Sequence, residues 1–421
     1  MHRYLLLVVL ASGCSFRVAG IDSSGAGGDG GDAPAGDDLA GNDSTNAPDM
    51  ASDPVGDMAM SAPDLAPMPL QLSHLPQHYL SDAQCDLTIN SSIDTTARKV
   101  DGSNVPADCL FVLDSESGGL AVSVLVVNSL TIPAGTVTVT GANPLVIVAR
   151  TTITVAGVLD ASGKKTVPGA GGSPPTVGAG AGPDGVHAAP YSDSGGNGGS
   201  FGSAGNQGGV GSYNNVTASP LPVSSVYGSA SLATSVPGGS GGGTGASEGC
   251  NSNNGGNGGA GGGSIQLSAG DSITIGGMIN VGGGAGGGGC KTSTVNEGSG
   301  GGGGSGGAIF LESPTVMISG GLWANGGSGG GGASGPDNAG SDGSNGTLTR
   351  TGAVGGPSGG TYGGIGGVGG AAMTVAGVGG TQANGGGGGG GVGRIVVRSR
   401  GAATLPATNA SPVPYLDPAI P

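Results

Sequence analysis

The chain has little of the material from which a conventional enzyme core is built. Of its 421 residues only 3% are aromatic and 9% are charged, whereas 101 are glycine, about 24% where roughly 7% is usual. Lys and Arg number 12 against 27 Asp and Glu, so the formal net charge is −15. Binding to DNA or RNA needs clustered basic side chains, and the composition therefore argues against a nucleic-acid partner. So much glycine is typical of repetitive chains.

Long apolar runs are also missing. The N-terminus combines a basic residue, Arg3, with an apolar run over residues 4–10 and small residues directly before Cys14. This order predicts a signal peptide over residues 1–13, with a run too short to span a bilayer. The sequence Ala-Ser-Gly-Cys resembles the lipobox of bacterial lipoproteins, whose cysteine becomes the lipidated N-terminus. The resemblance implies that Cys14 is an anchor in the outer membrane, because Ser15 rather than Asp follows it.

Basic residues are absent between Arg17 and Arg98, and this region begins with a chain of Gly, Ala, Asp, Pro and Ser that holds ten aspartates. Such a segment cannot bury enough apolar surface to offset the entropy of ordering, and its like charges repel one another. We therefore predict a disordered tether over residues 14–75. A calcium-binding loop would need acidic residues at repeated short spacings, and Asp29 and Asp32 do not repeat.

Short strand-like runs recur along the rest of the chain. Runs of alternating polar and aliphatic residues begin at Ser129, Thr152, Ser272 and Thr315, and each is followed by a glycine and a second short run. A third kind of run precedes the later repeats, at residues 263–267, 307–311 and 393–397, with an earlier counterpart at 146–148. This repetition predicts an all-β fold, an interrupted parallel β-solenoid whose coils stack aliphatic side chains inward. The inward set is Leu130, Ile132, Ile153, Val155, Ile273, Ile275, Val316 and Ile318.

Glycine-rich sequence interrupts the repeats at one equivalent point. Leu130 and Ile153 lie 23 residues apart, but 120 residues separate Ile153 from Ile273 and 43 separate Ile273 from Val316. We expect a cap over 76–118, the solenoid over 119–405 with arms at 164–263, 284–307 and 328–392, and a tail over 406–421. The arms should emerge on one side. They are either mobile loops, or extended helices of the polyproline II kind that pair their backbones side by side.

Four cysteines remain after Cys14, an even number in a chain predicted to be exported, which indicates disulfides. We favour Cys85 with Cys109 and Cys250 with Cys290 among the three pairings that are open. Zinc is the weaker interpretation, because no short C-x₂-C spacing exists. We expect no metal site and no cofactor.

Catalytic patterns match only by chance in so much glycine. G-x-S-x-G occurs around Ser240, Ser305 and Ser328 without the strand-turn-helix setting of a nucleophile elbow, and two phosphate-loop patterns are near misses. The strands supply only Asp160 and Glu312 as carboxylates, too few for the paired acid and base of glycoside hydrolysis. Three further groups have structural interpretations: Arg394, Arg398 and Arg400 as solvated strand ends, Lys164 and Lys165 as exposed, and Trp323 as a filler or cap.

The lipobox, the acidic tether, repeats of the form I-T-I-x-G-x-I-N-V-G-G and the closing G-V-G-R-I-V-V resemble the glycine-rich predicted lipoproteins of myxobacteria and related delta-proteobacteria. The resemblance implies a cell-surface protein, with no catalytic residues to carry over. Our leading hypothesis is a non-enzymatic, lipid-anchored protein whose glycine-rich face makes structural or adhesive contacts, with polysaccharide or with other copies of itself. The alternatives are a carbohydrate-active or polysaccharide-binding protein, and a passive surface layer.

Overall fold

Short β-strands make up nearly all the regular structure of the described residues. The computed structural model describes residues 70–417 except 83, 248–254, 292–296, 336–337, 402 and 407. Cys14, the predicted signal peptide and most of the predicted tether therefore lie outside the described residues. Within the described part, α1 (Tyr79–Asp82) is the sole helix. The prediction of an all-β fold is confirmed.

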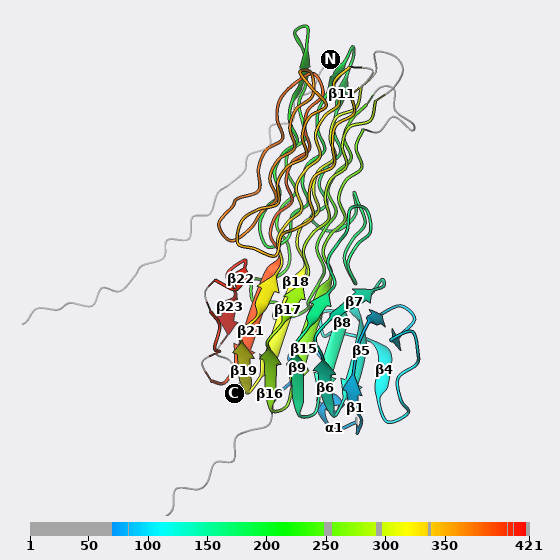
Figure 1. Cartoon of the computed structure of the whole chain (residues 1–421), viewed down its shortest axis with the longest axis vertical. Coiled ribbons are helices and arrows are strands. Elements are labelled where there is room, and N and C mark those ends of the chain that lie inside the picture. The colour runs from blue at the N-terminus through cyan, green and yellow to red at the C-terminus, as the bar shows by residue number, and fades with distance from the viewer. Residues whose placement is uncertain are drawn as a thin grey trace, which may run out of the picture. The chain divides into compact units, whose positions relative to one another are not determined.

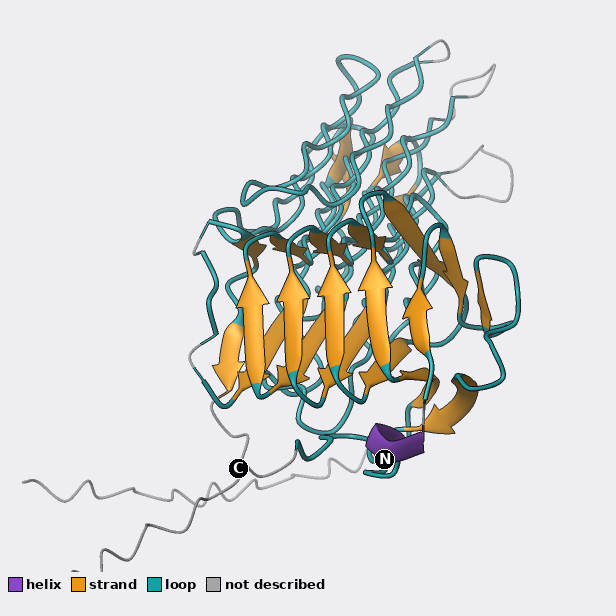
Figure 2. Ribbon diagram, turned by 60° about the horizontal axis from the view of Figure 1, so that its bottom comes forward, coloured by secondary structure: helices purple, strands orange, loops and turns teal. Residues whose placement is uncertain are grey.

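Most strands belong to three sheets that the chain visits in a fixed order (Figure 2). The first sheet holds β1 (Asp86–Thr88), β6 (Ser129–Ile132), β9 (Thr152–Val155), β16 (Ser272–Ile275) and β19 (Thr315–Ile318). The second, in spatial order, holds β22 (Ala410–Ser411), β20 (Gly321–Trp323), β17 (Met278–Asn280), β10 (Val158–Asp160), β7 (Thr136–Thr140), β2 (Ser92–Asp94) and β3 (Lys99–Val100). The third holds β23 (Tyr415–Asp417), β21 (Arg394–Ser399), β18 (Ala308–Ser313), β15 (Ser264–Ala269), β8 (Leu145–Ala149), β5 (Ala121–Val127) and β4 (Leu110–Ser115).

Equivalent aliphatic residues pair between neighbouring strands of the first sheet. Ile153 pairs with Leu130 on one side and with Ile273 on the other, and Ile273 pairs with Val316. All eight residues predicted to stack inward are at most 2% exposed. The expected ladder is therefore present, and burial of each such side chain contributes roughly 1.5–3 kcal/mol.

Two of the three sheets are mixed, which differs from the wholly parallel arrangement that the repeats predict. β3 pairs antiparallel with β2, and β4 pairs antiparallel with β5, whereas the other pairs within these sheets are parallel. Both exceptions are at the N-terminal edge, where tight turns reverse the chain. Asp94 Oδ1 accepts hydrogen bonds from the amides of Thr96 and Ala97 in the first turn, and Gly119 has a φ of +82° in the second. Such local bonds and glycine favour short hairpins.

The predicted N-terminal cap supplies strands of its own to the sheets. β1 pairs with β6, and β2 pairs with β7, so the segment extends the stack of strands rather than closing it as a separate element. The disulfide between Cys85 and Cys109 is confirmed, with their Cα atoms 5.3 Å apart. Cys290 is also disulfide-bonded, but Cys250 lies outside the described residues and its pairing remains a prediction.

Three long insertions leave the sheets at one junction, as predicted. Each runs from a strand of the second sheet to a strand of the third, over residues 161–263, 281–307 and 324–393. We call these insertions together the glycine array. At the preceding turn the same junction, between β7 and β8, takes only residues 141–144. The array projects from one end of the sheets (Figure 1). It carries two small hairpins, one formed by β11 (His187–Ala188) with β12 (Ser192–Asp193) and one by β13 (Gly211–Tyr213) with β14 (Val216–Ala218).

Backbone hydrogen bonds join the array into a lattice with a period of three residues. Along segment 384–393, the amides of Gly386 and Gly389 donate to segment 377–380 and those of Gly387 and Gly390 donate to segment 327–330. The amides between them donate to segment 196–199, and the carbonyls accept from segments 206–209, 300–306 and 367–370. The segment thus bonds to six others. A period of three is that of polyproline II, so the arms are packed extended helices rather than mobile loops.

Glycine is required in this lattice because neighbouring backbones leave no room for a side chain. A Cβ at Gly303 would lie 2.1 Å from the carbonyl oxygen of Gly327, and one at Gly390 would lie 2.1 Å from that of Gly304. In the interior of the array the backbone amides and carbonyls bond to one another. These interior groups are therefore not available to a partner.

Candidate functional site

Three tyrosines cluster where the two hairpins meet a third loop. Tyr191 belongs to the β11–β12 hairpin, Tyr213 to β13, and Tyr362 to the loop before Gly363. The rings of Tyr191 and Tyr213 have centroids 5.9 Å apart, and those of Tyr213 and Tyr362 are 6.2 Å apart, both edge to face. We call them the tip tyrosines, because Figure 1 places β11 at the end of the array remote from the three sheets.

The array holds the backbone beneath the tip tyrosines in place. The amide of Asp193 donates to Ala383, while its carbonyl accepts from Gly385. Gly211 bridges to Gln382, and the amide of Asn384 donates to the carbonyl of Tyr362 at 3.0 Å. These bonds bring together residues up to 192 positions apart in the chain. The tip is therefore a composite of the first and third insertions.

Polar groups flank the tip tyrosines. His187 Nδ1 lies 2.6 Å from Asp193 Oδ1, and the Asp193 side chain is only 2% exposed. Asn384 Nδ2 donates to Glu297 Oε2 at 2.6 Å. Burial raises the pKa of the Glu297 carboxyl, although the Gly335 amide and Asn384 oppose it. Each of these polar groups has a partner within the protein, so they support the loops rather than form an acid–base pair.

A second polar cluster is buried on the outer face of the third sheet. Gln266, Ser268 and Glu312 point away from the aliphatic core, and the segment that begins at Leu70 covers them. Glu312 accepts hydrogen bonds from Ser268 Oγ at 2.7 Å, from Gln266 Nε2 at 3.3 Å and from the Ser73 hydroxyl. We call Ser73, His74, Glu116, Gln266, Ser268 and Glu312 the buried clamp.

His74 and Glu116 form the second part of the buried clamp. His74 Nδ1 lies 3.0 Å from Gln266 Oε1 and 3.7 Å from Glu116 Oε1, and neither side chain is exposed. Burial raises the pKa of Glu116, while the Val236 amide and His74 act in the opposite direction. A histidine beside a carboxyl group resembles an acid–base pair, but the side chains of His74 and Glu116 are buried and closed to substrate. The clamp fastens residues 70–75, which were expected to belong to the tether, onto the sheet.

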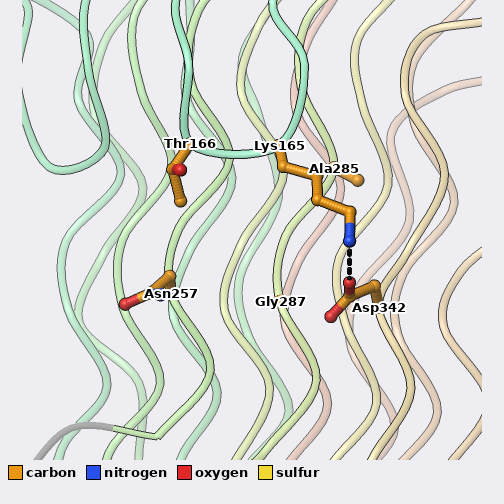
Figure 3. A pocket seen from close by; sticks show the side chains of 6 residues that line it. All are labelled: Lys165, Thr166, Asn257, Ala285, Gly287 and Asp342. Atoms are coloured by element: carbon orange, nitrogen blue, oxygen red, sulfur yellow. Dashed lines mark ion pairs between the residues drawn. The ribbon is translucent and has the colours of Figure 1, made fainter.

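A pocket of about 250 Å³ lies on the side of the array, lined by Lys165, Thr166, Asn257, Ala285, Gly287 and Asp342 (Figure 3). Lys165 Nζ and Asp342 Oδ2 are 2.8 Å apart. The hydrogen bond to Asp342 raises the pKa of Lys165, and the same bond lowers the pKa of Asp342. The two charges neutralise each other, and the pair joins the first insertion to the third. Lys165 was expected to be merely exposed.

The serines of the chance G-x-S-x-G matches have structural roles. Ser240, Ser305 and Ser328 are buried in the array. Ser240 Oγ donates to the Tyr227 hydroxyl at 3.1 Å, and Ser328 Oγ donates to the Val354 carbonyl at 2.6 Å. These serines therefore hydrogen-bond within the array, and none of the three is bonded to a histidine.

Four other interpretations change or gain detail. Arg398 is not a solvated strand end, because its guanidinium lies 2.7 Å from Asp417 Oδ2 and over the Phe310 ring. Arg394 likewise donates to the Tyr227 carbonyl at 2.9 Å. Trp323 is buried, which agrees with the filler interpretation and excludes stacking on a sugar. Asp160 lies 3.1 Å from Lys164.

Sequence reasoning missed both clusters. The tip tyrosines are spread over residues 191–362 and the buried clamp over residues 73–312, with no motif in either. A usable signal for the clamp was the polar residue at alternate positions of β15 and β18, on the face opposite the core. The signal for the tip was the rarity of aromatic residues in glycine-rich sequence.

The described part of the chain contains no group of three or more metal-ligating side chains and no helix with the length and apolarity to cross a membrane. Comparison with protein families, with curated proteins and with solved structures finds no match for this chain.

Proposed function

We propose that this chain is a lipid-anchored protein of the cell surface with an adhesive role and no catalytic activity. In this proposal a signal peptide over residues 1–13 is removed, Cys14 carries the lipid in the outer membrane, and the three sheets form an interrupted β-solenoid. The repeated order of the sheets and the common junction of the insertions support the solenoid. Stable anchoring needs two or more acyl chains, which lipoproteins carry.

The observation that carries the proposal is the glycine array itself. Each segment is bonded to several neighbours, so the array is a stiff projection that holds loops far from the sheets. An enzyme would place paired acid and base groups in an accessible pocket. Here Asp160 pairs with Lys164, and Glu312 lies in the buried clamp. Other carboxylates of the described strands also accept hydrogen bonds within the protein, among them Asp86, Asp94 and Asp114. A stiff support with exposed side chains at its end suits adhesion.

The experiment compares attachment of producing cells with and without the protein. Deletion of the gene should lower attachment to surfaces or to other cells several-fold, and the wild-type gene should restore it. The Cys14→Ser variant should leave the membrane fraction, fail to incorporate labelled palmitate and fail to restore attachment. Unchanged attachment after deletion would contradict the adhesive role, and palmitate incorporation by Cys14→Ser would contradict the anchor.

A second candidate function, self-association of copies, rests on one flank of the array. Ile365 and Val368 are three residues apart, as are Val375 and Val378, so each pair projects from one side of a three-residue helix. Together with Val354 and Met373 they form the aliphatic flank, with exposures from 37% to 86%. Residues 351–393 contain no charged side chain in a protein of net charge −15. Exposed apolar patches of this kind mark interaction surfaces.

Sedimentation velocity tests this candidate. The wild-type protein should form dimers as its concentration rises through the micromolar range, and Ile365→Asp with Val375→Asp should keep it monomeric. Val413→Asp is the matched control, because Val413 is 68% exposed but lies outside the array. If the wild-type protein stays monomeric at every concentration, self-association through the aliphatic flank is contradicted.

A further inference from the structure

We infer that the tip tyrosines form a binding site for a neutral polysaccharide chain. The inference rests on the proposed adhesive function and names the ligand class for it. Tyr191 is 37% exposed and Tyr362 is 52% exposed. Among the described residues, the hydroxyls of the three tip tyrosines have no hydrogen-bond partner, so they are available to a ligand.

The ring geometry suits a sugar. Pyranose units carry C–H groups on their faces and hydroxyls around their rims, and a tyrosine offers an apolar ring with a polar tip. The rings meet edge to face rather than stacked in parallel, and Tyr191 and Tyr362 are partly exposed, so each offers ring surface to a ligand. A cluster of three rings, with neighbouring centroids 5.9 and 6.2 Å apart, offers more contact surface than one monosaccharide needs, which favours a chain of sugar units.

The charge around the tip favours a neutral chain. The exposed neighbours of Tyr213 include Asn214, Asn215 and Gln382, whose amides both donate to and accept from hydroxyl groups. His187 is paired with Asp193, and Tyr362 lies in the uncharged stretch 351–393. An anionic polysaccharide would be repelled by a protein of net charge −15.

The backbone of the tip is held in its shape before any ligand binds. Tyr191, Asn214 and Asn215 have φ values of 65°, 48° and 64°. A bulky residue such as tyrosine rarely takes a positive φ, and such strain gathers at functional sites. Bonds from Asp193 to Ala383 and Gly385, and from Ser212 to Gln382, hold the two hairpins on the array. Loops fixed in this way lose little freedom on binding, which favours affinity.

The test is affinity electrophoresis of the full-length protein in detergent through gels that contain dextran, starch, xylan, laminarin or alginate. The net negative charge moves the protein, and binding slows it. At least one neutral polysaccharide should retard the wild type, with no retardation by alginate. The double variant Tyr191→Ala/Tyr362→Ala should bind at least tenfold more weakly, a loss typical of aromatic anchor residues. Tyr415→Ala is the control, since Tyr415 is 49% exposed but lies in β23.

A second measurement needs no variant. Tetranitromethane nitrates accessible tyrosines, and the retarding polysaccharide should protect Tyr191 and Tyr362 but not Tyr415. The inference is overturned if no neutral polysaccharide retards the protein, if alginate retards it equally, if Tyr415→Ala weakens binding as much as the double variant, or if nitration is unprotected. If the protein binds no polysaccharide but cells that produce it attach normally, only this inference is contradicted. If the protein binds a polysaccharide but deletion of the gene leaves attachment unchanged, the adhesive function is contradicted.

Discussion

Gly303→Ala should lower the free energy of unfolding by about 3 kcal/mol, as measured by urea denaturation. Gly303 is in a segment bonded on several sides, its amide donating to Gly388 and its carbonyl accepting from Gly199. The added methyl carbon would lie 2.1 Å from the carbonyl oxygen of Gly327. Backbone cannot rotate away as a side chain does, so neighbouring segments must move apart and lose hydrogen bonds. Amides 300–306 should then exchange with solvent faster.

The matched control is Gly276→Ala. Gly276 lies in the exposed turn between β16 and β17, its backbone is not left-handed, and the nearest atom to an added Cβ is 3.9 Å away. This change should stay within about 0.5 kcal/mol of the wild type. If Gly303→Ala were equally mild, the array segments would have to be loosely associated, and the stiff support on which the adhesive proposal rests would be lost.

Glu312→Ala should also cost about 3 kcal/mol, because it leaves several buried donors without an acceptor. The donors are the hydroxyls of Ser73 and Ser268 and the amide of Gln266. Ser73 belongs to the segment that covers the sheet, so its release should expose residues 70–82 to protease. Limited proteolysis followed by mass spectrometry would detect cleavage there, before the sheets themselves unfold.

Glu312→Gln separates the effect of the carboxylate from that of the hydrogen bonding and bulk of the side chain. The amide keeps one acceptor oxygen and nearly the same volume, so the loss of stability should be smaller than for Glu312→Ala. Cleavage within residues 70–82 should remain slow. Equal effects of the two substitutions would mean that the negative charge, rather than hydrogen bonding and packing, holds the covering segment.

The strands were predictable because their pattern is local. The alternation in Thr152–Val155, Ser272–Ile275 and Thr315–Ile318 identified β9, β16 and β19 with their boundaries, since burial on one side of a strand requires a period of two. The disulfide between Cys85 and Cys109 was chosen correctly among open pairings. The common junction of the insertions followed from where glycine interrupts the repeat.

Other features depend on contacts between distant residues. Ser73 meets Glu312, and Tyr213 meets Tyr362, through distances along the chain that no periodicity encodes. Glycine content alone also left loops and packed helices equally open. The deciding factor is whether each amide finds a carbonyl on another segment, and that is a property of the assembled lattice.

By itself, then, the order of residues determined the strand positions, the all-β class and the junction at which the arms leave, because these depend on burial and on repeats within one turn. Only the tertiary structure decided that the arms are a hydrogen-bonded array, that their glycine backbones are used internally, and that tyrosines gather at the tip. A run of glycines has no sequence pattern that identifies which segments its amides and carbonyls will bond to. Those partners depend on how all the segments pack together.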